Sequence, residues 1–182
     1  MADIVLKGNT SGAITIAAPA VAGTNTLTLP ASTSTIATTA DVNALTTGKI
    51  LQVVHVIVST LVTTTSSTHV TTGITAAITP SSTSSKIYIL TKTTAQGNSS
   101  TDCLTAIYRG TVSGTNLTGN ASTKYNTSNN EPSDMVNSFL DSPSTTSATT
   151  YTLGFKSSVS GQTAKANVAN VDGFITLMEV AG

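Results

Sequence analysis

The stretch KILQVVHVIV, residues 49–58, is the longest nearly unbroken apolar run in the chain. Valine and isoleucine dominate it, and β-branched side chains fit a pleated sheet better than a helix. The run is bounded by Gly48 and by a tract of serine and threonine, and it is too short to cross a bilayer as a helix. We therefore expect a strand that is buried on both faces and around which a β domain is organised.

Further apolar or alternating segments follow this run at short intervals, separated by turn residues. No long amphipathic helix pattern is present, so the spacing predicts an all-β domain, an antiparallel β-sandwich of jelly-roll-like type. First and last strands are commonly neighbours in such folds, and we expect residues 49–58 to pair near residues 174–180. The expected strands are 49–58, 68–72, 74–78, 86–92, 104–109, 115–118, 135–141, 151–156, 163–168 and 174–180.

Residues 1–47 contain only short segments of alternating apolar residues. Residues 13–16 and 24–29 alternate with period two, which predicts short strands, and residues 41–45 could form one helical turn. These segments are too small to bury their side chains alone, so they need a partner surface. We expect an N-terminal extended β arm, residues 1–47, that docks by strand addition, followed by the β-sandwich, residues 48–182. The candidate docking residues are Ile14, Ile16, Leu27 and Leu29.

The composition favours a protein of an assembly. Charged residues make up only 9% of the chain, the formal net charge is zero, and serine and threonine together number 61. Such a surface lacks the charge repulsion that keeps soluble monomers apart. A neutral chain also lacks the electrostatic footprint of a nucleic-acid-binding protein, and no signal peptide or membrane span is visible, so neither nucleic acid nor membrane is an expected partner.

The sequence contains few residues that could carry chemistry. They are His55, His69, Cys103, Glu131, Asp134, Asp141 and Glu179. Neither histidine has another ligand at metal-binding spacing, and a histidine inside residues 49–58 is better explained as a core or interface residue. Asp134 and Asp141 lie at the two ends of one expected strand, about 23 Å apart when extended, which is too far for a glycosidase pair. We expect no catalytic residue, no metal site and no cofactor.

Two regions resemble a known family. Residues 8–42 are similar to a segment of bacteriophage virion proteins, notably tail fibres and appendages of marine and cyanobacterial phages; the stretches that carry this are GNTSGAITI (8–16), PAVAGTNTLTLP (19–30) and TADV (39–42). The remainder resembles a β domain that commonly ends such proteins. The stretches that carry this second resemblance are residues 48–54, 138–143, 149–153 and 175–180.

The resemblance implies a virion structural protein rather than an enzyme. The chain is short, and neither a tail-attachment domain nor a long shaft is expected, which favours a small appendage over a long fibre. It implies most specifically a homotrimeric capsid cement or decoration protein. Such a protein is assembled in the host cytoplasm, lies on the capsid exterior and stabilises the head shell, binding the major capsid protein or another virion protein. The alternative is a short tail fibre or receptor-binding protein that recognises host glycan; a polysaccharide-degrading enzyme ranks third.

Overall fold

The computed structural model describes residues 4–7, 13–16, 48–98, 101–120, 122–124, 131–168 and 171–182. The chain divides into two compact units, Met1–Ala40 and Asp41–Gly182. The described part contains thirteen strands and no α-helix, which confirms the all-β class. Consequently, no helix able to cross a membrane occurs among these residues. The expected boundary between residues 47 and 48 stays a prediction, because residues 17–47 lie outside the described part.

The first unit contains one antiparallel pair of strands, β1 (Ile4–Lys7) and β2 (Ala13–Ile16). The sequence predicts the second of these with the same bounds, whereas it predicts no strand at residues 4–7. The strand expected at residues 24–29 and the helical turn expected at residues 41–45 lie outside the described residues.

One sheet of the second unit, the first sheet, contains six strands. They are β3 (Ile50–Val58), β4 (Val62–Thr64), β6 (Lys86–Gly97), β10 (Ser133–Asp141), β12 (Ala164–Ala166) and β13 (Gly173–Val180). β13 and β10 pair with the two sides of β6, and β3 pairs with β13; all pairings are antiparallel. β12 continues the line of β13 along β6 and in turn pairs with β4. The sheet is therefore four strands wide, in the order β3, β13, β6, β10.

The second sheet contains five strands. They are β5 (Val70–Ile78), β7 (Cys103–Arg109), β8 (Thr115–Asn116), β9 (Ser122–Lys124) and β11 (Thr149–Ser157). β11 lies between β5 and β7, while β8 and β9 both pair with β7. β4 and β9 have no counterpart among the strands expected from the sequence, because they are short and consist of serine, threonine, lysine and one valine.

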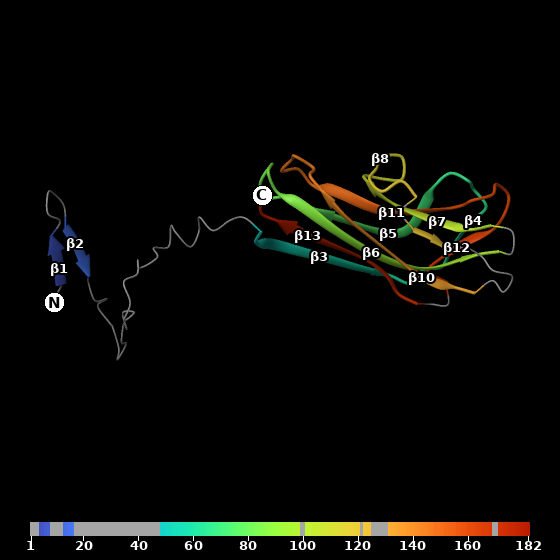
Figure 1. The fold of residues 1–182 in the computed structure, drawn as a ribbon, viewed down its shortest axis with the longest axis horizontal. Helices are drawn as coiled ribbons and strands as arrows, with labels where there is room; N and C mark the ends of the chain where they lie inside the picture. Colours follow the sequence, from blue (N-terminus) through green and yellow to red (C-terminus); the bar gives the residue numbers. More distant parts are fainter. Residues whose placement is uncertain are drawn as a thin grey trace. The chain divides into compact units, whose positions relative to one another are not determined.

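The connectivity of the two sheets is that of a jelly-roll-like sandwich. The chain passes from sheet to sheet after β4, β5, β6, β9, β10 and β11, and the two sheets form the layers visible in Figure 1. The first strand, β3, lies beside the last, β13, with Val56 opposite Ile175 and Val53 opposite Met178. This confirms both the antiparallel sandwich and the pairing of the two ends of the domain that the sequence predicts.

Aliphatic side chains from both sheets fill the space between the layers. Ile89 and Ile175 of the first sheet and Ile74, Ile107 and Leu153 of the second sheet are fully buried in one cluster. Burial alternates with period two in β3, β5, β10 and the first half of β6, which is why alternating sequence segments formed these strands. In contrast, β7 and β11 are buried at most positions. The loss of this apolar area from water is the main favourable contribution to folding.

Asn167 forms hydrogen bonds near two breaks in the first sheet, one between β3 and β4 and the other between β12 and β13. This fully buried residue lies in the break between β12 and β13 and has a positive φ of 57°. Its side-chain amide donates to the carbonyl oxygens of Thr60 and Thr72, each at 2.9 Å, and its Oδ1 accepts a hydrogen bond from Thr93 at 2.9 Å. One side chain thus connects β6, the start of β5 and the break between β3 and β4.

β5 runs without interruption through Gly73, where the sequence predicts two strands, 68–72 and 74–78. Gly73 has a φ of 82°, and the register of β11 against β5 shifts there, as in a β-bulge. The Thr72 hydroxyl donates to the carbonyl oxygen of Leu153 at 2.8 Å and so satisfies an acceptor beside the irregularity. The glycine marks a bulge inside one strand rather than a turn between two.

β3 is an edge strand, so the expectation that residues 49–58 are buried on both faces is wrong. Among the described residues its only strand partner is β13. Val54 and Val56 pack against the core, whereas Val53 is 55% and Ile57 is 58% exposed. A continuous apolar run shows that both faces are apolar, but it does not show that the chain itself covers both.

Neighbouring positions of β3 therefore differ in their tolerance of charge. We expect Val54→Asp to prevent folding, because it places an unpaired carboxylate against the core at a cost of several kcal/mol. Val53→Asp, one position along but on the exposed face, should fold. Circular dichroism and thermal melting of the two variants test this, and equal loss of structure in both would contradict the assigned orientation of β3.

Candidate interaction surface

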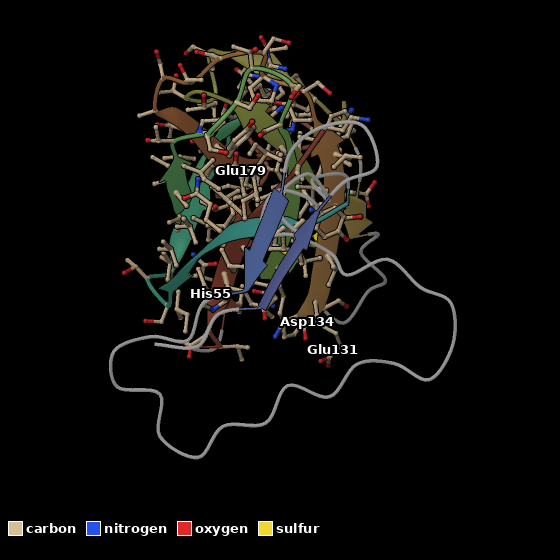
Figure 2. The ribbon with its side chains drawn as sticks, turned by 90° about the vertical axis from the view of Figure 1, so that its left-hand side faces the viewer. His55, Glu131, Asp134 and Glu179 are labelled. Carbon is tan, nitrogen blue, oxygen red and sulfur yellow. The ribbon has the colours of Figure 1, made fainter. Side chains whose placement is uncertain are left out.

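The titratable residues considered in the sequence do not meet at one site. In Figure 2, His55, Asp134 and Glu179 lie well apart, and Glu131 lies near Asp134 at an exposed end of the domain. Within the part of the chain that the structure describes, no group of three or more His, Cys, Asp or Glu side chains could hold a metal ion. A shallow hollow lined by Gln96, Gly97, Asn98, Thr163 and Lys165 contains no carboxylate.

Asp141 belongs to a buried network between the sheets. Its carboxylate accepts hydrogen bonds from the Tyr151 hydroxyl at 2.7 Å and from Arg109 Nε at 2.8 Å, and Arg109 also forms an ion pair with its second oxygen. Burial, followed by the adjacent carboxylate, raises the pKa of Tyr151. The hydrogen bond to Asp141 raises the pKa of Arg109. These shifts keep the Tyr151 hydroxyl protonated and the Arg109 guanidinium charged at neutral pH, which suits a structural role.

Glu179 is fully buried at the end of β13. Burial by itself raises the pKa of this carboxyl, but hydrogen bonds from Ser81 and Gln52 outweigh it and lower the pKa to about 2. The backbone N–H and hydroxyl of Ser81 and the side-chain amide of Gln52 all donate at 2.6 Å. The carboxylate therefore fastens β13 to β3 and to the segment that follows β5.

The two histidines have separate structural surroundings. His55 Nδ1 lies 2.8 Å from Thr176 Oγ1, and the His55 ring packs against Phe174 on the outside of the first sheet. His69 Nδ1 lies 3.0 Å from the Tyr108 hydroxyl in the second sheet. Burial, with a smaller contribution from the charge of Lys156, lowers the pKa of His69 to about 4, so this ring is neutral at pH 7.

Cys103, the single cysteine of the chain, is buried, and burial raises the pKa of its thiol to about 12. A thiol with such a pKa carries almost no thiolate at neutral pH and is a poor nucleophile. It packs in the second apolar cluster of the core with Met135 and Phe155.

The proposed docking residues of the arm remain a prediction. Ile14 and Ile16 lie in β2, opposite Leu6 and Ile4 of β1. Leu27 and Leu29 lie outside the described residues.

The feature that stands out is the outward side of the first sheet, which we call the outer face. Its positions follow from the register of β3, β13, β6 and β10, since residues directly opposite one another share a side. They form three rows across the four strands. The rows are Leu140–Tyr88–Met178–Val53, Ser138–Leu90–Thr176–His55 and Val136–Lys92–Phe174–Ile57.

Most of the outer face is apolar, and its four corners are strongly exposed. Val53, Ile57, Val136 and Leu140 are each between 50% and 58% exposed. Sequence reasoning recognised residues 49–58 as an apolar run but assigned both of its faces to the core. The exposed members could have been found only by noting that β3 and β10 have apolar residues at two of their three positions in these rows.

The charges on the outer face are balanced within the chain. Lys92 Nζ lies 3.1 Å from Asp134, the carboxylate next to the third row. Hydrogen bonds from Thr94 and then from Lys92 lower the pKa of Asp134, so its carboxylate stays ionised at neutral pH. The outer face therefore presents no net charge from these two residues.

The outward side of the second sheet is different, because the chain covers part of it. The segment 110–119 follows β7 and folds back over it: the Val112 side chain lies close to Gly154, and Asn116 donates a hydrogen bond to the Tyr108 hydroxyl at 3.2 Å. The exposed outward positions of β5 are small or polar, including Thr75 and Ala77. Only the first sheet leaves a large apolar surface open among the described residues.

Comparisons with known proteins do not identify a family. No family model matches the sequence, and no curated protein matches it. Among solved structures, one match is "Structure of infectious bursal disease virus Gx strain", with 12% identity, a TM-score of 0.36 and coverage of 73% of this chain. The match covers 33% of that viral chain, so this protein spans about a third of its length. A likeness at this level carries no argument about function.

The buried carboxylate of Glu179 predicts a specific dependence of stability on pH. Its pKa in the folded protein, about 2, lies below the ordinary value of 4.5. The stabilisation is therefore fully present above about pH 5 and is lost as the pH falls towards 2. Glu179→Gln should cost about 3 kcal/mol at pH 7 and flatten the fall of the melting temperature below pH 5.

Glu131→Gln is the matched control, because Glu131 is exposed and should leave the melting profile unchanged. Thermal melts between pH 2 and 7 measure all three proteins. If the wild type and Glu179→Gln lose stability in parallel between pH 5 and 2, the depressed pKa is refuted.

Proposed function

We propose that this protein is a non-enzymatic structural protein of a bacteriophage particle, most specifically a homotrimeric capsid cement or decoration protein that binds and stabilises the head shell. The observation that carries the proposal is the outer face, an open apolar surface on a jelly-roll domain of a chain with zero net charge. Exposed apolar patches of this kind mark protein–protein contacts. Such a surface suits a protein that works inside an assembly.

The surroundings of the titratable residues support a structural rather than a catalytic role. Asp141 is bound to Arg109 and Tyr151, and Glu179 is bound to Ser81 and Gln52. A general acid or base needs an open approach to substrate and a pKa near the working pH. Both carboxylates are fully or almost fully buried and saturated with internal partners.

The sequence motifs support the assignment to a phage particle. Residues 8–30 are similar to a segment of phage virion proteins, and the arm that contains them is the proposed anchor on the major capsid protein or another virion protein. The jelly roll would then project from the capsid exterior, after assembly in the host cytoplasm. The proposal includes no nucleic acid, membrane or cofactor.

Copy number in the purified particle tests the proposal. A decoration protein occupies repeated positions of a shell, so we expect hundreds of copies per particle by quantitative mass spectrometry against the major capsid protein. Particles that lack the protein should lose their contents at a lower temperature, and adding the purified protein should restore heat resistance. A count of only a few to tens would reject the capsid role in favour of a tail fibre, and absence from the particle would reject both.

The arm can be tested separately from the domain. The compact second unit has its own core, so residues 48–182 should fold without the arm, as judged by circular dichroism, but should not bind particles lacking the native protein. In the full chain, Ile14→Ser with Ile16→Ser should weaken attachment at least tenfold, because strand addition places alternate side chains in pockets. Thr15→Ser, on the opposite side of β2, is the control. Equal attachment by the arm-less domain would show that the arm is not the anchor.

A further inference from the structure

We propose that the outer face of the first sheet is a self-association surface, covered in the assembled protein by other copies of this chain. This inference rests on the proposed function in that it locates the contact through which a homotrimer forms. Four properties of the outer face favour a second copy: its size, the chemistry of its borders, its charge and the lack of a covering segment among the described residues.

The size of the outer face suits a contact between folded proteins. Four strands spaced about 4.8 Å apart and three rows spaced about 7 Å apart give roughly 400 Å² in projection. This lies within the range of the largest apolar patches on monomers, about 300–600 Å², which are often functional. It is about half of the roughly 800 Å² that each partner contributes to a stable interface. Ile50 and Leu51, both exposed at the start of β3, extend the apolar area beyond the three rows.

The borders of the outer face are aliphatic on both sides. Val53 and Ile57 lie on β3, and Val136 and Leu140 lie on β10. Around a closed symmetric ring, each sheet meets one neighbour along its β3 border and the other along its β10 border. Apolar side chains therefore meet apolar side chains at every contact. A surface designed for a polar or charged partner would carry matching groups at these four positions.

Charge also favours a second copy over a different partner. Lys92 is neutralised by Asp134 of the same chain, and the remaining positions of the three rows carry no carboxylate or ammonium group. Within the three rows, a copy of the chain consequently meets no like charge; Lys86 lies outside them, opposite Val180 in the next register row. A strongly basic or acidic partner gains no electrostatic attraction there.

The edge of β3 continues the same surface. β3 has nine residues, contains no proline or charged residue, and pairs on one side only within the described domain. Proteins that work as monomers usually protect such an edge with lysine, proline or a covering segment. An exposed apolar edge beside an exposed apolar face indicates that assembly, rather than the domain itself, covers both.

Sedimentation of the full-length protein at micromolar concentration tests the proposal. The wild type should sediment as an oligomer, and the double variant Val53→Asp with Val136→Asp should sediment as a single chain with its circular dichroism spectrum retained. Val159→Asp is the control, because Val159 is also an exposed valine but lies outside the outer face; it should remain oligomeric. A monomeric wild type, or a double variant that still assembles, would overturn the proposal.

An uncharged substitution on the outer face provides a second test if the aspartate variants do not fold. Ser138 lies in the middle row and is exposed, so Ser138→Cys introduces a thiol midway along the β10 border of the outer face, while the native Cys103 is buried. Alkylation of this thiol should be at least tenfold slower than that of Ser147→Cys, in an exposed loop, and should accelerate on dilution. Equal rates at all concentrations would show that no copy covers the outer face.

These outcomes are separate from those of the particle experiments. A protein that is monomeric in solution but present in hundreds of copies on the head would retain the proposed function and lose this inference. A protein that assembles through the outer face but is absent from particles would do the reverse.

Discussion

The pairing of β13 between β3 and β6 is the contact on which the rest of the structure depends. It joins the two ends of the domain, since β3 and β13 are its first and last long strands. The inward side of β13 contributes Ile175 and Leu177 to the core, and both are fully buried. Near its C-terminal end, β13 contributes Glu179, whose carboxylate accepts hydrogen bonds from Gln52 of β3 and from Ser81, which follows β5. Sheet formation, core packing and the closure of the domain therefore rely on one strand.

Buried hydroxyl and amide side chains form hydrogen bonds inside this domain. Thr72, Thr93 and Asn167 are fully buried and hydrogen-bonded to one another or to backbone carbonyl groups. Small hydroxyls can satisfy buried backbone groups without the desolvation penalty of an ionised side chain. The same composition gives an outer surface without charge repulsion. The low charge thus affects both the inside of the domain and its capacity to assemble.

The outer face links this composition to the proposed role. Among the described residues, the segment 110–119 covers part of the second sheet, whereas no segment covers the first sheet, which has the more apolar outward side. In a protein that acts alone, the opposite arrangement would be expected, because an open apolar sheet promotes aggregation. Under the proposed role, neighbouring copies of the chain would cover the open apolar face of the first sheet, while the arm would bind the particle.

The sequence by itself determined the class of fold, the approximate positions of most long strands and the pairing of residues 49–58 with residues 174–180. These properties depend on local alternation and turn residues, which are visible in single segments. Only the tertiary structure decided which side of each apolar strand faces the core. Val53 and Val54 are the same amino acid at adjacent positions, yet one is exposed and one packs against the core, because their environment depends on strands distant in sequence. For the same reason no local pattern indicated the roles of Glu179 and Asn167: a buried polar residue is identified by its partners, and those partners come together only in the folded chain.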